Sequence, residues 1–166
     1  MIKLHTIGQK GVTLVEMLIV MGLLAVFLLI MTTIFTSTLD IQNQSAAYSA
    51  VVSDGRFIMA RINYDIAQST SITSPTTLGV TSASLVMTTS TNSYTYTLNG
   101  GNLQLTDNTG SANLNSSGTT VSNLSFTKLG NAGGKNTTRY TFTLTSTAKH
   151  SGTTDSQTFT SVAGRR

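Results

Sequence analysis

The sequence predicts an α+β fold, in which a long N-terminal helix packs on an antiparallel β-sheet. Residues 11–35 form an almost unbroken apolar run, and residues 36–70 continue with apolar side chains at helical spacing. After Pro75 the pattern changes, and apolar residues alternate with polar ones, as in strands that have one buried face. A helix followed by a run of hairpins is typical of an α+β domain.

The composition narrows the classes of function. The chain has 166 residues, which suits one domain plus an anchor, and it has no cysteine for a disulfide or a thiolate metal site. Its formal net charge is +4, but Lys3 and Lys10 precede the apolar run. The remaining positive charge is too small to predict nucleic-acid binding. His5 and His150 lie far apart, whereas metal ligands come in clusters, so we expect neither a metal site nor a cofactor.

The apolar run is long enough to cross a membrane. Residues 12–35 would make a helix of about 36 Å, and the hydrocarbon core of a bilayer is about 30 Å thick. Lys3 and Lys10 before the run predict a cytoplasmic N-terminus, with the rest of the chain outside. A cleaved secretory signal would have a shorter apolar core of about 7–15 residues. A plain signal anchor would fit the length, but it leaves Glu16 unexplained unless this acid reaches the lipid headgroups.

Three residues at the start of the run carry a resemblance to a known family. The string QKGVTLVEMLIVMGLLAV, with Gly11, Val12 and Glu16, resembles the cleavage and methylation motif of type IV pilins and type II secretion pseudopilins. The resemblance implies that a prepilin peptidase cuts after Gly11 and N-methylates Val12, and that Glu16 steers assembly. Val12 stands where the family usually has Phe or Met. Thr33 stands where many major pilins have a proline, so we expect a continuous helix.

The resemblance also implies a pilin-like division of the chain and a set of partners. We expect a leader peptide at 1–11, a transmembrane and polymerisation helix at 12–35, an amphipathic helix at 36–70 and an extracytoplasmic β-sheet domain at 71–166. The implied partners are prepilin peptidase, other pilin-like subunits and the inner membrane, without nucleic acid. The subunit would be a single-pass membrane protein before assembly and part of an extracytoplasmic or cell-surface filament afterwards.

The second part of the predicted helix has one apolar face. This face recurs at steps of three, four or seven residues and comprises Ala47, Val51, Ile58, Ile62 and Ile66. Arg61 and Asp65 have the spacing of an ion pair on a helix surface. Gly55 weakens the helix by about 1 kcal/mol relative to alanine. The helix is expected to end near Thr70, ahead of Pro75.

The predicted strands form two sets. The first contains Leu85 and Met87, then Tyr94, Tyr96 and Leu98, the turn Asn99-Gly100-Gly101, and Leu103 and Leu105. A polar loop is predicted from Asp107 to Thr120. The second set contains Leu124 and Phe126, the loop Gly130–Asn136, then Tyr140, Phe142 and Leu144, and a last strand with Phe159 and Val162. Consecutive hairpins of this kind favour an antiparallel sheet.

The sequence offers no catalytic constellation. The carboxylates Asp54, Asp65, Asp107 and Asp155 are scattered and have no partnered histidine, so an enzyme is not predicted. The pairs Gly100-Gly101 and Gly133-Gly134 lie in hairpin-like loops with no following helix, which indicates turns rather than phosphate sites. Four Asn-x-Ser/Thr triplets open at Asn43, Asn115, Asn123 and Asn136, but in a chain so rich in Ser and Thr they do not predict glycosylation.

The leading hypothesis is therefore a minor pilin or pseudopilin that acts in an initiating or tip complex of a filament. The segments DGRFIMARINYDIAQSTSI and SQTFTSVAGRR look like those of W-type minor pilins and J-type pseudopilins. The alternative is an adhesin or DNA-uptake pilin whose loops Asp107–Thr120 and Gly130–Asn136 contact an external ligand. Neither loop has the interleaved basic and aromatic residues that are typical of nucleic-acid readers. Lys128, Lys135 and Arg139 flank one hairpin, and we expect them to form a solvated edge.

Overall fold

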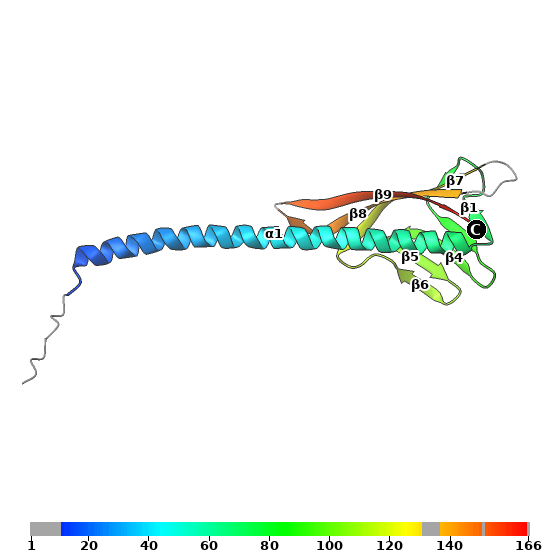
Figure 1. The fold of residues 1–166 in the computed structure, drawn as a ribbon. Coiled ribbons are helices and arrows are strands. Elements are labelled where there is room, and N and C mark those ends of the chain that lie inside the picture. The colour runs from blue at the N-terminus through cyan, green and yellow to red at the C-terminus, as the bar shows by residue number, and fades with distance from the viewer. Residues whose placement is uncertain (1–10, 131–136, 151, 166) are drawn as a thin grey trace, which may run out of the picture. The chain divides into compact units, whose positions relative to one another are not determined.

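The computed structural model describes residues 11–130, 137–150 and 152–165. The described residues form one helix, α1 (Leu14–Gln68), followed by nine strands. The strands are β1 (Ser71–Ser74), β2 (Thr81–Ser82), β3 (Leu85–Thr88), β4 (Ser93–Asn99), β5 (Asn102–Asp107), β6 (Gly110–Asn113), β7 (Thr119–Leu129), β8 (Thr137–His150) and β9 (Thr153–Gly164). The predicted α+β class is confirmed (Figure 1).

The strands make two antiparallel sheets rather than the single sheet that was expected. Sheet A has the order β1-β3-β4-β5-β6, and sheet B has the order β2-β7-β8-β9, within the described part of the chain. Figure 1 shows strands of both sheets running beside the C-terminal part of α1. Several sequence-based predictions fall outside the described residues: those for Lys3, His5 and Lys10, and for residues 131–136 with Gly133, Gly134, Lys135 and Asn136.

The chain divides into two compact units between Ile41 and Gln42. In the first unit, the described residues from Leu14 onward are helical. The hydroxyl groups of Thr32 and Thr33 donate hydrogen bonds to the carbonyl oxygens of Leu28 (2.8 Å) and Leu29 (3.0 Å). Such bonds satisfy a polar side chain inside an apolar helix. The helix continues through Thr33, which confirms the continuous helix predicted from the missing proline.

In the second unit, α1 supplies one side of the hydrophobic core. The predicted apolar face is confirmed, since all five of its residues are buried. Four of them, from Val51 onward, join a single cluster with residues of both sheets, such as Tyr96 of sheet A and Phe126 and Phe142 of sheet B. Burying side chains of this size contributes about 1.5–3 kcal/mol each. The helix therefore holds the two sheets together through a shared core.

Gly55 explains how closely sheet B approaches the helix. A Cβ atom added at Gly55 would lie 2.2 Å from the Cζ atom of Phe159. The Phe159 ring is buried against the helix backbone and stacks on Phe142, with ring centroids 5.4 Å apart. The glycine that appeared to weaken the helix is thus the place where an aromatic ring of β9 docks.

A buried polar cluster joins the helix to sheet A. Asp65 is 2% exposed, and its Oδ2 atom accepts hydrogen bonds from the Tyr96 hydroxyl and from Arg61 Nε, the latter at 2.9 Å. Arg61 also lies over the Tyr94 ring, 5.9 Å from its centroid. Burial, reinforced by the neighbouring Asp65 carboxylate, raises the pKa of Tyr96 well above the ordinary tyrosine value. The predicted Arg61–Asp65 ion pair exists. It is not an isolated surface pair, because Asp65 also binds Tyr96 of β4.

Sheet A contains a hairpin that the sequence predicted and a strand that it did not. Gly100 and Gly101 both have positive φ, and they form the two-residue turn between β4 and β5. The predicted loop from Asp107 to Thr120 is wrong in part, because β6 pairs with β5 inside it. Asp107 Oδ1 closes that turn by accepting hydrogen bonds from the Thr109 amide (2.7 Å) and the Gly110 amide (3.1 Å).

The connection from sheet A to sheet B is tied to the helix. Asp54 Oδ2 accepts hydrogen bonds from the Ser116 amide (2.9 Å), the Ser116 hydroxyl (2.8 Å) and the Thr119 hydroxyl (2.6 Å). Asn115 is buried, accepts a hydrogen bond from the Leu103 amide and donates one to the Thr119 carbonyl. Its side-chain amide is therefore buried and hydrogen-bonded inside the fold.

Sheet B provides the rest of the core. Tyr140 and Phe142 on β8 and Phe159 on β9 face the helix, and the Tyr140 hydroxyl donates to Asn63 Oδ1 at 2.8 Å. The last predicted strand is confirmed as β9, but its two marker residues point to opposite sides: Phe159 is buried and Val162 is 54% exposed. Asn123 has a φ of 52° at the irregularity in β7, a conformation that asparagine tolerates better than most residues.

Candidate processing and assembly site

The candidate site begins just before α1. Gly11, Val12 and Thr13 are exposed and precede the helix, which starts at Leu14. Nothing lies within 4 Å of the position that a Cβ atom of Gly11 would take. The peptide bond between Gly11 and Val12 is thus in an exposed, non-helical segment, as an enzyme that must reach the backbone requires.

Thr13 caps the helix, and the sequence reasoning missed this role. The Glu16 amide donates a hydrogen bond to Thr13 Oγ1 (3.2 Å), and the Met17 amide donates to the Thr13 carbonyl (3.2 Å). Both bonds satisfy amides at the helix start, and the first gives a partner to an amide that would otherwise lack one. The signal was present as Thr-x-x-Glu directly before an apolar run, the pattern of a capping box.

Glu16 is an acid on an otherwise apolar surface. It lies exposed in the first turn of α1, where the helix dipole favours a negative charge by about 0.3–1 kcal/mol. Ile19 and Val20, its neighbours one turn further, are exposed apolar residues. The structure therefore places Gly11, Val12 and Glu16 within one short segment and leaves the Glu16 carboxylate exposed.

The apolar surface that follows is uncovered. Large apolar residues from Val12 to Phe35 are about half exposed or more, with Leu14 at 77%. Among the described residues, one helix, α1, is long and apolar enough to cross a membrane. Water is a poor environment for so much contiguous apolar surface, so lipid or other apolar helices must cover it. This segment anchors the chain in a membrane before assembly.

Three of the four acids that are scattered in the sequence have structural partners. Asp54 bonds to the connection between the sheets, Asp65 bonds to Tyr96, and Asp107 closes a turn. The fourth, Asp155, has a buried Oδ2 atom without a hydrogen-bond partner in the described part of the chain. No group of three or more histidine, aspartate or glutamate side chains that could hold a metal ion occurs in residues 11–130, 137–150 and 152–165. The structure does not bring the predicted acids together into an acid–base pair.

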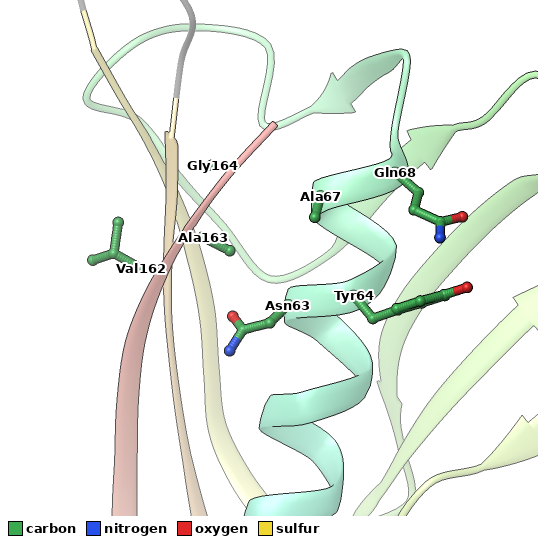
Figure 2. Close-up of a pocket in the computed structure, with 7 residues that line it drawn as sticks. All are labelled: Asn63, Tyr64, Ala67, Gln68, Val162, Ala163 and Gly164. Carbon is green, nitrogen blue, oxygen red and sulfur yellow. The ribbon is translucent and has the colours of Figure 1, made fainter. Parts of the chain in front are cut away.

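An open hollow of about 490 Å³ lies between the end of α1 and the end of β9. Figure 2 shows Ala163 pointing toward the helix and Val162 pointing away from it. Asn63, which lines this hollow, accepts a hydrogen bond from the Tyr140 hydroxyl through its Oδ1 atom. The other lining side chains are Tyr64, Ala67 and Gln68, with Gly164 completing the wall. These lining residues include no carboxylate, imidazole or amine.

Comparison with known proteins gives a match that includes the candidate site. Residues 7–32 match the family model of the prokaryotic N-terminal methylation motif, a stretch that contains Gly11, Val12 and Glu16. No curated protein and no solved structure matches the chain significantly. The family match thus covers residues 7–32, of which 14–32 belong to α1.

Proposed function

We propose that this chain, whose methylation motif and long apolar helix fit a type IV pilin-like precursor, is a minor pilin or pseudopilin. The motif implies processing by prepilin peptidase and assembly with other pilin-like subunits. In this proposal the peptidase cuts after Gly11 and methylates Val12. The mature subunit then enters a type IV pilus or a type II secretion pseudopilus, in an initiating or tip complex.

The observation that carries the proposal is Glu16 on the apolar helix. Inside a filament core, this carboxylate would lose water, and an unpaired buried charge is strongly unfavourable. Cleavage after Gly11 creates an amine at Val12, which stays positive after a single methylation. Pairing the Val12 amine of one subunit with Glu16 of its neighbour would neutralise both groups. Such a pair would also define the axial offset between subunits.

In the same proposal, the N-terminus faces the cytoplasm and the two sheets lie on the other side of the membrane. The absence of cysteine supports a minor role, since major pilins more often end in a disulfide-closed region. In the Asp107–Thr120 segment, the side chains of Asp107 and Asn115 are hydrogen-bonded within the fold and Thr119 bonds to Asp54, whereas residues 108–113 are exposed. Exposure of these residues does not by itself favour the adhesin alternative over the filament subunit.

Mass spectrometry of the protein from native membranes and sheared filaments tests the processing. We expect a mature chain that begins at Val12 and carries one additional methyl group, recovered in the filament fraction. An intact chain that begins at Met1, or one cut beyond the apolar run, would contradict the proposal.

Substitution of Glu16 tests the assembly step separately. Glu16→Gln keeps the shape of the side chain and removes its charge, so cleavage should proceed while incorporation into filaments falls by about tenfold or more. Asp40→Asn is the matched control, because Asp40 is an exposed acid on the same helix. Normal incorporation of the Glu16→Gln chain would contradict the pairing of the Val12 amine with Glu16. Equal losses for both variants would show that helix charge in general, rather than Glu16, is what matters.

A further inference from the structure

The outward face of sheet B carries an ordered set of hydroxyl groups. Three pairs face each other across β8 and β9: Thr141 with Thr160, Thr143 with Thr158, and Thr145 with Ser156. Their side chains are on the side opposite to the buried Phe142, Leu144 and Phe159, because successive residues of a strand alternate between faces. We call these six residues the hydroxyl grid.

The hydroxyl grid is organised before any ligand arrives. The two oxygens of each pair are hydrogen-bonded, at 3.1 Å, 2.9 Å and 3.0 Å in the order given above. A hydroxyl has one hydrogen and two lone pairs, so each pair keeps one hydrogen and three lone pairs for a ligand. Threonine is also restricted at χ1 by its branched Cβ. These side chains would therefore lose little further conformational entropy when a ligand binds.

The spacing of the hydroxyl grid is regular across β8 and β9, and hydroxyl groups continue onto a third strand, β7, whose register shifts between Ser122 and Ser125. Strands lie about 4.8 Å apart, and residues two apart on a strand are separated by about 6.8 Å. On β7, the residues that face the grid are Thr120 opposite Thr145, Ser122 opposite Thr143 and Ser125 opposite Thr141. Three strands thus present hydroxyl groups in three successive rows.

The chemistry of this face selects the kind of partner. The three rows, all made of described residues, contain no charged side chain; Arg139 and Lys149 stand beyond them on β8. A nucleic acid would require basic residues, often with aromatic ones, and a protein partner would require an apolar or aromatic centre. A face that offers only hydroxyl donors and acceptors complements a neutral ligand that is itself rich in hydroxyl groups. We propose that the hydroxyl grid binds a neutral polysaccharide.

A polymer suits this face better than a small sugar. A hydrogen bond between neutral groups is weak in water because it replaces bonds to solvent. A repeating ligand can form many such bonds at once. Each further bond then forms within the same complex and raises the overall affinity. The proposal is independent of filament assembly, because the face belongs to residues 42–166 and needs no second subunit.

Co-sedimentation of the full-length chain in detergent with microcrystalline cellulose or chitin tests the proposal, with heparin beads as the anionic comparison. We expect retention on cellulose or chitin that persists at high salt. In the grid variant, Thr143, Thr158 and Thr160 are all replaced by valine, which keeps the shape and strand preference of threonine. Its apparent affinity should fall by about tenfold to a hundredfold.

The matched control variant replaces Thr95, Thr97 and Thr106 of sheet A by valine, and it should bind like the unmodified chain. Thr158→Lys, a single change at an exposed position, should also abolish retention if the triple variant does not fold. No retention on either neutral polymer, equal loss in the grid and control variants, or retention only on heparin would each overturn the proposal.

Discussion

At the residue scale, a few side chains have roles that their type alone would not suggest. Gly55 receives the ring of Phe159, and Asp65 is a buried acceptor for Tyr96 rather than a surface partner of Arg61. Glu16 shares its turn with the capping residue Thr13. In each case the role depends on one neighbour at a defined distance, so each residue can be tested by a single substitution.

Gly55→Ala should destabilise the folded chain by about 1–3 kcal/mol, the usual cost of overpacking a core. The new methyl group would overlap the Phe159 ring, and this outweighs the gain of about 1 kcal/mol in helix propensity. Denaturant unfolding of the full chain in detergent measures the change. The control is Gly22→Ala on the same helix, where nothing lies within 4 Å of the added atom. A Gly55→Ala chain as stable as its parent would mean that Phe159 moves aside freely.

Tyr96 should make stability depend on alkaline pH. Its pKa is raised in the folded chain by burial and by Asp65, so the folded state keeps a proton that the unfolded state releases above about pH 10. The free energy of unfolding must then fall as the pH rises past that point. In Tyr96→Phe this fall should be less steep, by up to about 1.4 kcal/mol per pH unit.

Chemical unfolding at several values between about pH 9 and about pH 11 measures this slope. Tyr96→Phe should also be less stable than the parent at neutral pH, by about 1.5–3 kcal/mol, because it loses a hydrogen bond to a charged group. Tyr48→Phe, which removes an exposed phenol on the same helix, is the matched control. Identical slopes for Tyr96→Phe and its parent would contradict the role given to Asp65 and burial.

At the element scale, helix α1 could be predicted well and the sheets only in part. Apolar residues at helical spacing give α1 a signal that a single stretch of sequence contains, and its ends at Leu14 and Gln68 lie within two residues of those expected. The strand β6 has four exposed residues and hence no alternation to recognise. The strand β2 has only two residues. Both exist because a partner strand pairs with them, which local sequence does not reveal.

The division into two sheets could not be predicted from the sequence either, because it depends on contacts between residues that are far apart in the chain. Asp54 on α1 bonds to Thr119, which is 65 positions away, and that bond holds the chain where it passes from sheet A to sheet B. For the candidate site the situation is reversed. Gly11, Val12 and Glu16 lie within six residues of one another, so a short motif suffices to predict them.

Asp54→Ala should loosen the connection between the sheets without unfolding either one. Three hydrogen bonds to a carboxylate are lost, and we expect a destabilisation of about 2–4 kcal/mol. Hydrogen exchange should rise at the amides of residues 115–119 before it rises in β4 or β8. Asp40→Ala, at an exposed position of the same helix, should leave both measurements unchanged. Uniform acceleration across both sheets would show that Asp54 supports the whole core instead.

At the scale of the whole molecule, the chain joins two parts with opposite solvent requirements. Residues 42–166 enclose their own core, with charged residues few and hydroxyl groups many on the outside. The apolar residues between Val12 and Phe35 are exposed almost throughout. The core-forming part shields its own apolar side chains from water. The apolar part needs lipid or another protein to shield its side chains.

A charge in the middle of the apolar run should therefore change where the whole protein is found. Leu24→Arg should lower membrane integration by about 2.5–3.5 kcal/mol, or roughly a hundredfold, on the scale measured for helix insertion. Alkaline extraction of isolated membranes measures the integrated fraction. Asn43→Arg introduces the same charge at an exposed position beyond Ile41 and should leave that fraction unchanged. Equal extraction of both variants would mean that this segment does not anchor the chain.

The bare apolar surface of α1 also bears on whether assembly can be undone. A bilayer and a bundle of apolar helices shield this surface from water about equally well, so moving between them changes the hydrophobic free energy little. The hydrophobic effect keeps the subunit out of water, but it does not choose between lipid and filament. In the assembly that we propose, that choice falls to the few polar groups, and above all to Glu16. Under that proposal, the bilayer would store subunits, and a subunit could leave it for the filament and return to it.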